Sequence, residues 1–365
     1  MKYLDEFRNP ELAKGLLKQI EQQARQISVV KFMEVCGTHT MSIARYGLRR
    51  LLPDNIQLIS GPGCPVCVTP NTYLDTAVAY TRLDNVILTT FGDMLRVPGT
   101  SSSLEKERGT GADIRIVYST LDALEIARRN NDKQVIFLGI GFETTAPTVA
   151  ASIIQARESG LSNYTVFCAH KTMPAPMAAI AGAGKVSLNG FICPAHVSTI
   201  IGAEPYEFLV RKYGMCCVIA GFEPLDILES IHLLLQQVIA KKPEVEIQYS
   251  RVATRAGNPA ALKLMAEVFE ASDSTWRGLG VIPASGLKIK ESYAGFDSEK
   301  RFKVKVEHSQ EATGCRCGEV MQGIVQPPAC ALFGTVCTPE NPVGSCMVSS
   351  EGTCAAWYKY ELNVR

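Results

Sequence analysis

Six cysteines between residues 315 and 354 are the side chains of this sequence best suited to chemistry. So dense a group, on a chain whose first residues lack a secretion signal, is more typical of a metal centre than of structural disulfides. Four thiolates can hold a [4Fe–4S] cluster or a zinc ion. Zinc sites usually show two tight C-x2–4-C pairs, which this segment lacks, so we favour an iron–sulfur cluster over a zinc-stabilised tail. The six are Cys315, Cys317, Cys330, Cys337, Cys346 and Cys354.

Two short motifs near the N-terminus contain the other candidate reactive groups. Cys36 and His39 belong to the sequence CGTH, and a thiolate with an imidazole suits iron, zinc or copper. The alternative is a cysteine that ends a strand and a histidine that caps the next helix. Cys64 and Cys67 form a C-x-x-C pair, which supports either a dithiol/disulfide couple or two metal ligands. The residues alone leave both choices open.

Eight short apolar runs, rich in β-branched residues, must position these motifs. Segments with helical spacing separate them, and this alternation is typical of parallel strands buried on both faces. The sequence therefore predicts an α/β protein with two similar α/β/α domains and parallel sheets. The runs are 29–35, 56–60, 85–91, 114–119, 134–140, 164–169, 190–194 and 216–222.

Taken in chain order, four strands and four strands predict two successive domains. The first spans 29–131 and contains CGTH and CPVC, and the second spans 132–243 and ends in a long amphipathic helix. We expect residues 1–28 and 244–365 to form a third domain, which contains the cysteine segment. Within it, the charged stretch 300–308 has the alternation of a strand.

The unusual motifs follow the predicted strands directly. In an open parallel sheet, ligands bind in the crevice at the carboxyl ends of the strands. CGTH and GPGCPVC follow the first two runs, and four further motifs follow the last four runs. We therefore expect one site to gather these loops. The four further motifs are GFETTAP (141–147), HKTMPAP (170–176), PAHVST (194–199) and GFEP (221–224).

Composition limits the partners and the compartment. The chain of 365 residues carries 37 basic and 36 acidic residues, so no net field attracts nucleic acid or an anionic membrane. No run approaches the roughly 18 apolar residues of a membrane span. The first twenty residues are charged throughout and lack a signal-peptide core. We therefore expect a cytoplasmic protein that binds neither nucleic acid nor membrane.

The motifs together resemble the HypD family of [NiFe]-hydrogenase maturation factors. The matching elements run in order along nearly the whole chain, so the resemblance is highly specific. They are EVCGTHT (34–40), SGPGCPVCVTP (60–70), TTFGDMLRVPG (89–99), GFETTAP, PAHVSTIIG (194–202), AGFEP and the ending CALFGTVCTPENPVGSCMVSSEGTCAAWYKY (330–360).

The resemblance implies two α/β domains that face one cleft and a small third domain with a [4Fe–4S] cluster. The family's cluster pattern, C-x14-C-x6-C-x16-C, falls on Cys315, Cys330, Cys337 and Cys354. The remaining thiols, Cys317 and Cys346, are then left as a redox pair beside the cluster. The family's essential cysteine falls on Cys36, which would bind the iron under assembly, with His39 as a further candidate ligand. Cys64 and Cys67 would act as a redox couple.

The implied function is assembly of the Fe(CN)2CO group of [NiFe]-hydrogenases. The resemblance implies the small chaperone HypC as a partner, HypE as the thiocyanate-bearing donor of cyanide, and the hydrogenase large subunit as a contact made through HypC. Cyanide release from such a donor is reductive, so the cluster and the thiol pairs are expected to relay electrons. A different hypothesis is a freestanding iron–sulfur protein disulfide reductase, which would leave CGTH without a task.

Overall fold

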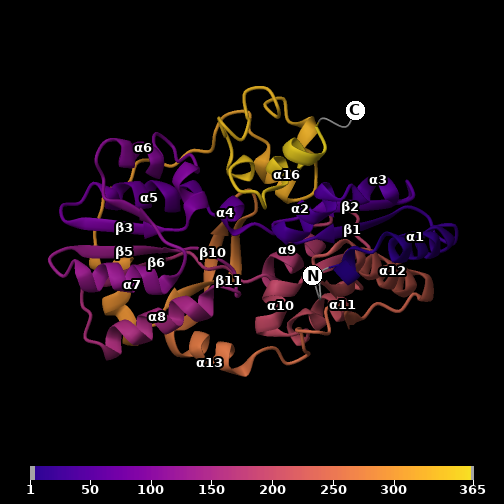
Figure 1. Ribbon diagram of the computed structural model, residues 1–365, viewed down its shortest axis with the longest axis horizontal. Coiled ribbons are helices and arrows are strands. Elements are labelled where there is room, and N and C mark those ends of the chain that lie inside the picture. Colours follow the sequence, from indigo (N-terminus) through magenta and orange to yellow (C-terminus); the bar gives the residue numbers. More distant parts are fainter. Residues whose placement is uncertain (1–4, 363–365) are drawn as a thin grey trace.

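The computed structural model describes residues 5–362 and contains two parallel sheets (Figure 1). All eight predicted strands are present. Sheet A has the order β2-β1-β7-β8-β9 and sheet B the order β4-β3-β5-β6. Sheet A contains β1 (Val30–Glu34), β2 (Ile56–Ser60), β7 (Gly190–Pro194), β8 (Cys216–Ala220) and the unpredicted β9 (Val245–Ile247). Sheet B contains β3 (Val86–Thr90), β4 (Ile114–Ile116), β5 (Gln134–Gly139) and β6 (Tyr164–Cys168).

The strands are not divided between the sheets at residue 131, as we expected from chain order. β1 pairs with β7, which lies far along the chain, and Met33 stands opposite Phe191 in that register. The segments 29–131 and 132–243 therefore each contribute strands to both sheets, and the predicted domain boundary is wrong. Hydrophobic runs identify buried strands, but a crossover connection can join strands of different sheets, so the runs do not reveal pairing.

The expected third domain also divides differently. Helix α1 (Pro10–Ala24) packs with α12 (Pro224–Ala240) against sheet A, where Ile20 and Leu235 share one core with Phe32. Helix α13 (Pro259–Val268) packs against α8 (Ala146–Glu158) on sheet B. The N-terminal helix therefore belongs to the sheet A unit and does not complete the cysteine-rich segment.

Between the two sheets stands an antiparallel hairpin of β10 (Phe269–Trp276) and β11 (Gly280–Ile289) (Figure 1). The strand predicted at 300–308 is absent: residues 302–312 have no regular structure and run along α5 (Asn71–Thr81), where Ser309 binds Asp75. Alternating Lys and Val did predict the period of a strand, but no neighbouring strand offers a partner there.

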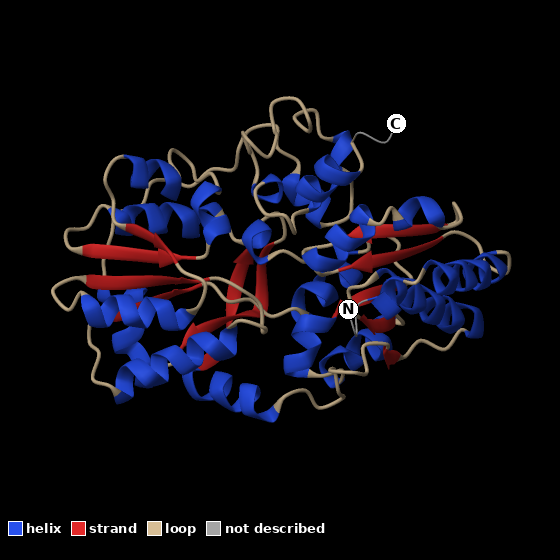
Figure 2. Cartoon of the chain, viewed as in Figure 1, coloured by secondary structure: helices blue, strands red, loops and turns tan. Residues whose placement is uncertain are grey.

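The carboxyl ends of both sheets point toward the middle of the molecule (Figure 2). There they meet α2 (Gly37–Arg45), α4 (Pro65–Val68) and the cysteine-rich segment with its helices α15 (Cys317–Met321) and α16 (Thr353–Tyr360). The remaining helices are α3 (Leu48–Leu51), α6 (Leu104–Gly109), α7 (Thr120–Arg129), α9 (Pro174–Ala183), α10 (Ala195–Ile201), α11 (Glu207–Tyr213) and α14 (Ser298–Arg301), and the 3-10 turns are η1 (Asp5–Arg8), η2 (Gly92–Arg96), η3 (Glu204–Tyr206), η4 (Glu291–Phe296), η5 (Pro327–Ala329) and η6 (Ser345–Met347). None of the helices in residues 5–362 has the length and apolar character needed to cross a membrane.

Candidate thiol and metal site

Cys36 occupies the N-cap position of α2, directly after β1. It is 8% exposed, and its side chain makes no capping hydrogen bond to the helix. Burial raises the pKa of the Cys36 thiol to about 12, and the nearby Glu351 carboxylate adds to that rise. A bound metal ion would reverse this effect, because a cation favours the thiolate that ligates it.

Close backbone approaches bring two other segments to Cys36. A side chain at Gly63 would overlap the backbone of Cys36, and one at Gly37 would overlap Glu351. The Thr38 hydroxyl donates to Glu351 Oε1 at 2.7 Å. The GPGC loop after β2 and the last part of the cysteine-rich segment therefore both contact CGTH.

His39 connects CGTH to the loop after β8. It is fully buried, and its Nε2–H donates to the carbonyl oxygens of Ala220 and Gly221, each at 3.0 Å. Its Nδ1 is buried without a hydrogen-bond partner. Burial lowers the pKa of His39 to about 4, so the imidazole is neutral at physiological pH. The free Nδ1 is the atom of this residue that a metal ion could use.

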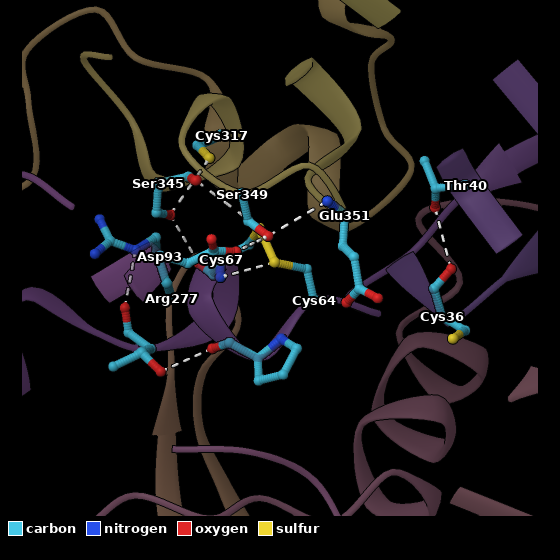
Figure 3. Close-up of a disulfide and its surroundings, with 12 residues drawn as sticks. Cys36, Thr40, Cys64, Cys67, Asp93, Arg277, Cys317, Ser345, Ser349 and Glu351 are labelled. Carbon is cyan, nitrogen blue, oxygen red and sulfur yellow. Dashed lines mark hydrogen bonds between the residues drawn. A yellow bond between two sulfur atoms is a disulfide. The ribbon is translucent and has the colours of Figure 1, made fainter. Parts of the chain in front are cut away.

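Cys64 and Cys67 are joined by a disulfide at the start of α4 (Figure 3). Cys64 is the N-cap residue, and its sulfur accepts the Cys67 N–H at 3.2 Å. Both residues are buried. Of the two chemistries open to a C-x-x-C pair, this structure contains the disulfide.

The six cysteines of the C-terminal segment line one apolar pocket, together with Gly344 and Val320. A side chain at Gly344 would approach the sulfur of Cys315 to 2.6 Å, so only glycine leaves room beside these thiols. The neighbouring thiols of Cys315 and Cys346 lower the pKa of Cys317 well below the usual range of a cysteine. Across residues 5–362, no three His, Cys, Asp or Glu side chains already stand at metal-ligating geometry, so the thiols share a pocket without a preformed coordination shell.

These residues fit a [4Fe–4S] cluster in chemistry and setting. A soft, thiolate-rich and largely apolar pocket is what such a cluster requires. The structure does not separate four ligands from two further thiols, because Cys317 and Cys346 line the same pocket as the expected ligands. Cys317 and Cys346 are unbonded neighbours here and do not form a disulfide.

Cys346 also lines a second, smaller pocket with Cys64, Cys67 and Glu351. Its neighbour Ser345 donates its hydroxyl to the carbonyl oxygen of Cys67 at 3.0 Å, and that hydroxyl lies 3.9 Å from the sulfur of Cys317 (Figure 3). The disulfide and the cysteine-rich pocket are therefore adjacent, and Cys346 contributes to both.

Several residues at this site were not among those that we selected from the sequence. Glu351 and Ser345 each lie within three residues of a selected cysteine, and this proximity is the only feature of the sequence that could have identified them. Arg277 is buried at the end of β10 and had no signal, because it stands alone between Trp276 and a glycine. Long-range contacts such as these depend on the fold and not on spacing.

A further buried acid follows β5. Glu143 is 2% exposed, and its Oε1 accepts the Met173 N–H at 3.0 Å while Oε2 has no partner. Burial raises the pKa of Glu143 to about 7. Glu143 lines a pocket between α9 and α11, apart from the thiols. The structure therefore brings CGTH, CPVC and the cysteine-rich segment together and leaves GFETTAP in a neighbouring pocket.

Comparison with known proteins agrees with the motifs. A family model described as HypD, hydrogenase formation hypA family, matches residues 11–361. The hydrogenase maturation factor HypD of Rhodobacter capsulatus is 49% identical over 370 residues, which cover 99% of this chain and 98% of that protein. The HypD of Azotobacter vinelandii is 48% identical over 367 residues (99% and 97%), and that of Escherichia coli (strain K12) is 43% identical over 366 residues (99% and 98%). This chain belongs to the HypD family of hydrogenase maturation factors.

Proposed function

We propose that this protein is the scaffold, together with HypC, on which the Fe(CN)2CO group of [NiFe]-hydrogenases is assembled, and that it binds the iron at Cys36. The observation that carries the proposal is the position of Cys36. Its sulfur lies at a helix N-terminus, and the disulfide loop and Glu351 contact the same motif. A soft thiolate suits an iron that carries cyanide and CO, and the neutral His39 supplies a second candidate donor.

The reduced Cys64–Cys67 pair can release cyanide from a thiocyanate donor with balanced chemistry. One thiolate attacks the sulfur of the donor R–S–CN, so the S–CN bond breaks and cyanide leaves. The second thiolate attacks the mixed disulfide and releases R–S⁻ while the Cys64–Cys67 disulfide forms. The two cysteines supply both electrons, and their two protons leave with the cyanide and the donor thiol. The step would leave Cys64 and Cys67 as a disulfide, which is the state that they have in this structure.

Cys346 can regenerate the Cys64–Cys67 dithiol, because it lies beside the disulfide in the same pocket. Its thiolate attacks the Cys64–Cys67 bond, one cysteine leaves as a thiolate, and Cys317 then attacks the mixed disulfide. Two electrons pass to Cys64 and Cys67, and a Cys317–Cys346 disulfide remains. We propose that Cys315, Cys330, Cys337 and Cys354 hold a [4Fe–4S] cluster. When bound, such a cluster supplies one-electron reducing equivalents at this pocket.

The partners of this scheme follow from its chemistry and from the family. HypE would bring the thiocyanate group to the buried disulfide, and HypC would carry the finished group to the hydrogenase large subunit. The carboxyl ends of both sheets converge where these groups must meet, which supports a shared docking region.

Infrared spectroscopy of the protein purified with HypC tests the proposal. We expect cyanide and CO stretching bands, and we expect Cys36→Ala to abolish them. Cys193→Ala is the matched control, because Cys193 is a fully buried strand cysteine and its removal should leave the bands in place. Bands that persist without Cys36 would refute the iron site. A protein without such bands that turns over protein disulfides would instead support the reductase hypothesis.

A further inference from the structure

Arg277 joins the end of β10 to the segment that follows the redox helix α4. Its side chain is 4% exposed. Nε donates to the carbonyl oxygen of Thr69 at 3.0 Å, and Nη2 donates to Asn71 Oδ1 at 2.6 Å. Nη1 pairs with Glu311, which lies on the irregular segment that leads to the cysteines. The backbone N–H of Arg277 donates to the carbonyl oxygen of Val68 at 2.8 Å.

The same turn also contacts the cysteine-rich segment. Gly278 has φ +76° and packs so tightly on Gly318 that a side chain would overlap the Gly318 backbone. Gln322 Nε2 donates to the carbonyl oxygen of Gly278 at 2.6 Å. The turn after β10 therefore touches α4 through Arg277, and through Gly278 it touches α15, which begins at Cys317.

Burial of a guanidinium costs free energy unless its N–H groups donate hydrogen bonds, and here three different groups accept hydrogen bonds from Arg277. The planar fork can reach acceptors in three directions, which a lysine ammonium on a flexible stem cannot reproduce. Glu311 is the only carboxylate among the three acceptors, and its side chain is 55% exposed. This set of acceptors indicates that Arg277 holds the contacting segments in place and does not mainly neutralise a buried negative charge.

We propose that Arg277 is a positioning residue that holds α4 so that Cys67 faces Cys346 of the cysteine-rich segment. The inference rests on the thiol exchange of the proposed function and assigns the residue that sets its distance. Arg277 does not react. Its removal should leave the thiols and the fold in place but misalign the two pairs.

A cross-linking experiment on the full-length protein as purified tests the assignment. In a Cys64→Ser background, Cys67 has no partner within α4, and diamide can accept the two electrons and two protons that Cys67 and Cys346 lose on bonding. Peptide mass spectrometry then measures the initial rate of Cys67–Cys346 formation. We expect Arg277→Gln and Arg277→Lys each to slow the formation of this disulfide about tenfold or more. A displacement of two reacting atoms by about 1 Å can slow their reaction by a large factor.

Three controls separate positioning from unfolding. The Cys317–Cys346 disulfide should form at the wild-type rate in Arg277→Lys, which keeps the positive charge that helps to lower the pKa of Cys317. Arg82→Gln makes the same chemical change at a 58% exposed side chain and should have no effect. Asn71→Ala removes only one acceptor of Arg277, so it should slow the cross-link by a smaller factor and serves if Arg277→Gln fails to fold.

The assignment is overturned by any of three results: no Cys67–Cys346 bond in the Cys64→Ser protein, an unchanged rate in Arg277→Gln or Asn71→Ala, or full recovery in Arg277→Lys, which would mean that charge alone matters. Failure of the proposed function looks different. A protein that cross-links as expected but shows no cyanide or CO bands with HypC would refute iron assembly and leave the role of Arg277 standing.

Discussion

The hydroxyl of Ser345 donates a hydrogen bond to the carbonyl oxygen of Cys67 at 3.0 Å, across 278 positions of the chain. Both residues are buried, so water does not compete for this bond. The next residue along the chain from Ser345 is Cys346, which lines the pocket beside the disulfide. One hydrogen bond thus joins the cysteine-rich segment to helix α4 where Cys346 lies beside the Cys64–Cys67 disulfide.

Removal of that bond should destabilise the protein modestly. We expect Ser345→Ala to lower the free energy of unfolding by about 1–3 kcal/mol, because the Cys67 carbonyl would remain buried without its donor. Urea unfolding at pH 7 measures the change. Ser159→Ala, at an exposed helix C-cap, is the matched control and should change stability far less. Equal effects in both variants would show that the bond contributes nothing specific.

Space beside the thiols should control metal loading. Gly344→Ala places a methyl group only 2.6 Å from the Cys315 sulfur, so we expect loss of most iron and sulfide per chain with little change in the circular dichroism of the two sheets. Gly15→Ala is the control, because a side chain at Gly15 in α1 meets no atom within 4 Å and alanine favours a helix. Normal iron content in Gly344→Ala would contradict the proposed cluster pocket.

The sequence was sufficient to locate the strands but not their partners. The apolar runs at 30–34 and 190–194 read alike, and nothing in either indicates that Met33 stands beside Phe191. The density of cysteines likewise singled out the six thiols that line one pocket. It could not place Cys346 beside the Cys64–Cys67 disulfide or reveal Arg277, since those contacts arise only when the hairpin inserts between the sheets.

Glu143 should make stability depend on pH, and one substitution should remove that dependence. Burial raises the pKa of its carboxyl from 4.5 to about 7, so the stability it contributes below pH 4.5 is lost as pH rises through 7. Glu143→Gln keeps an acceptor for the Met173 N–H and cannot ionise. We expect it to gain about 2–3 kcal/mol over the wild type at pH 8 relative to pH 4.5.

Urea unfolding of both proteins at the two pH values measures this difference directly. Glu204→Gln, an exposed residue of the same pocket, should show no such gain. A pH-independent difference between Glu143→Gln and the wild type would mean that the carboxyl titrates normally.

His39 should make the free energy of unfolding fall as the pH falls, which is opposite to the effect of Glu143. Burial lowers its pKa from 6.5 to about 4 in the folded protein, so the unfolded chain takes up a proton first as pH falls. The stability contribution is complete above pH 6.5 and disappears toward pH 4, with a loss of about 3 kcal/mol for one such group. His170, whose pKa burial lowers to about 3, adds a loss in the same direction.

His39→Gln isolates the first contribution, because a glutamine amide can still donate toward the Ala220 carbonyl but does not titrate. We expect this variant to be less stable than the wild type at pH 7.5 and to lose less stability between pH 6.5 and pH 4. His308→Gln, an exposed histidine, should follow the wild-type curve. Parallel unfolding curves for the wild type and His39→Gln across this range would mean that the folded protein protonates His39 as readily as the unfolded chain does, so that burial does not lower its pKa.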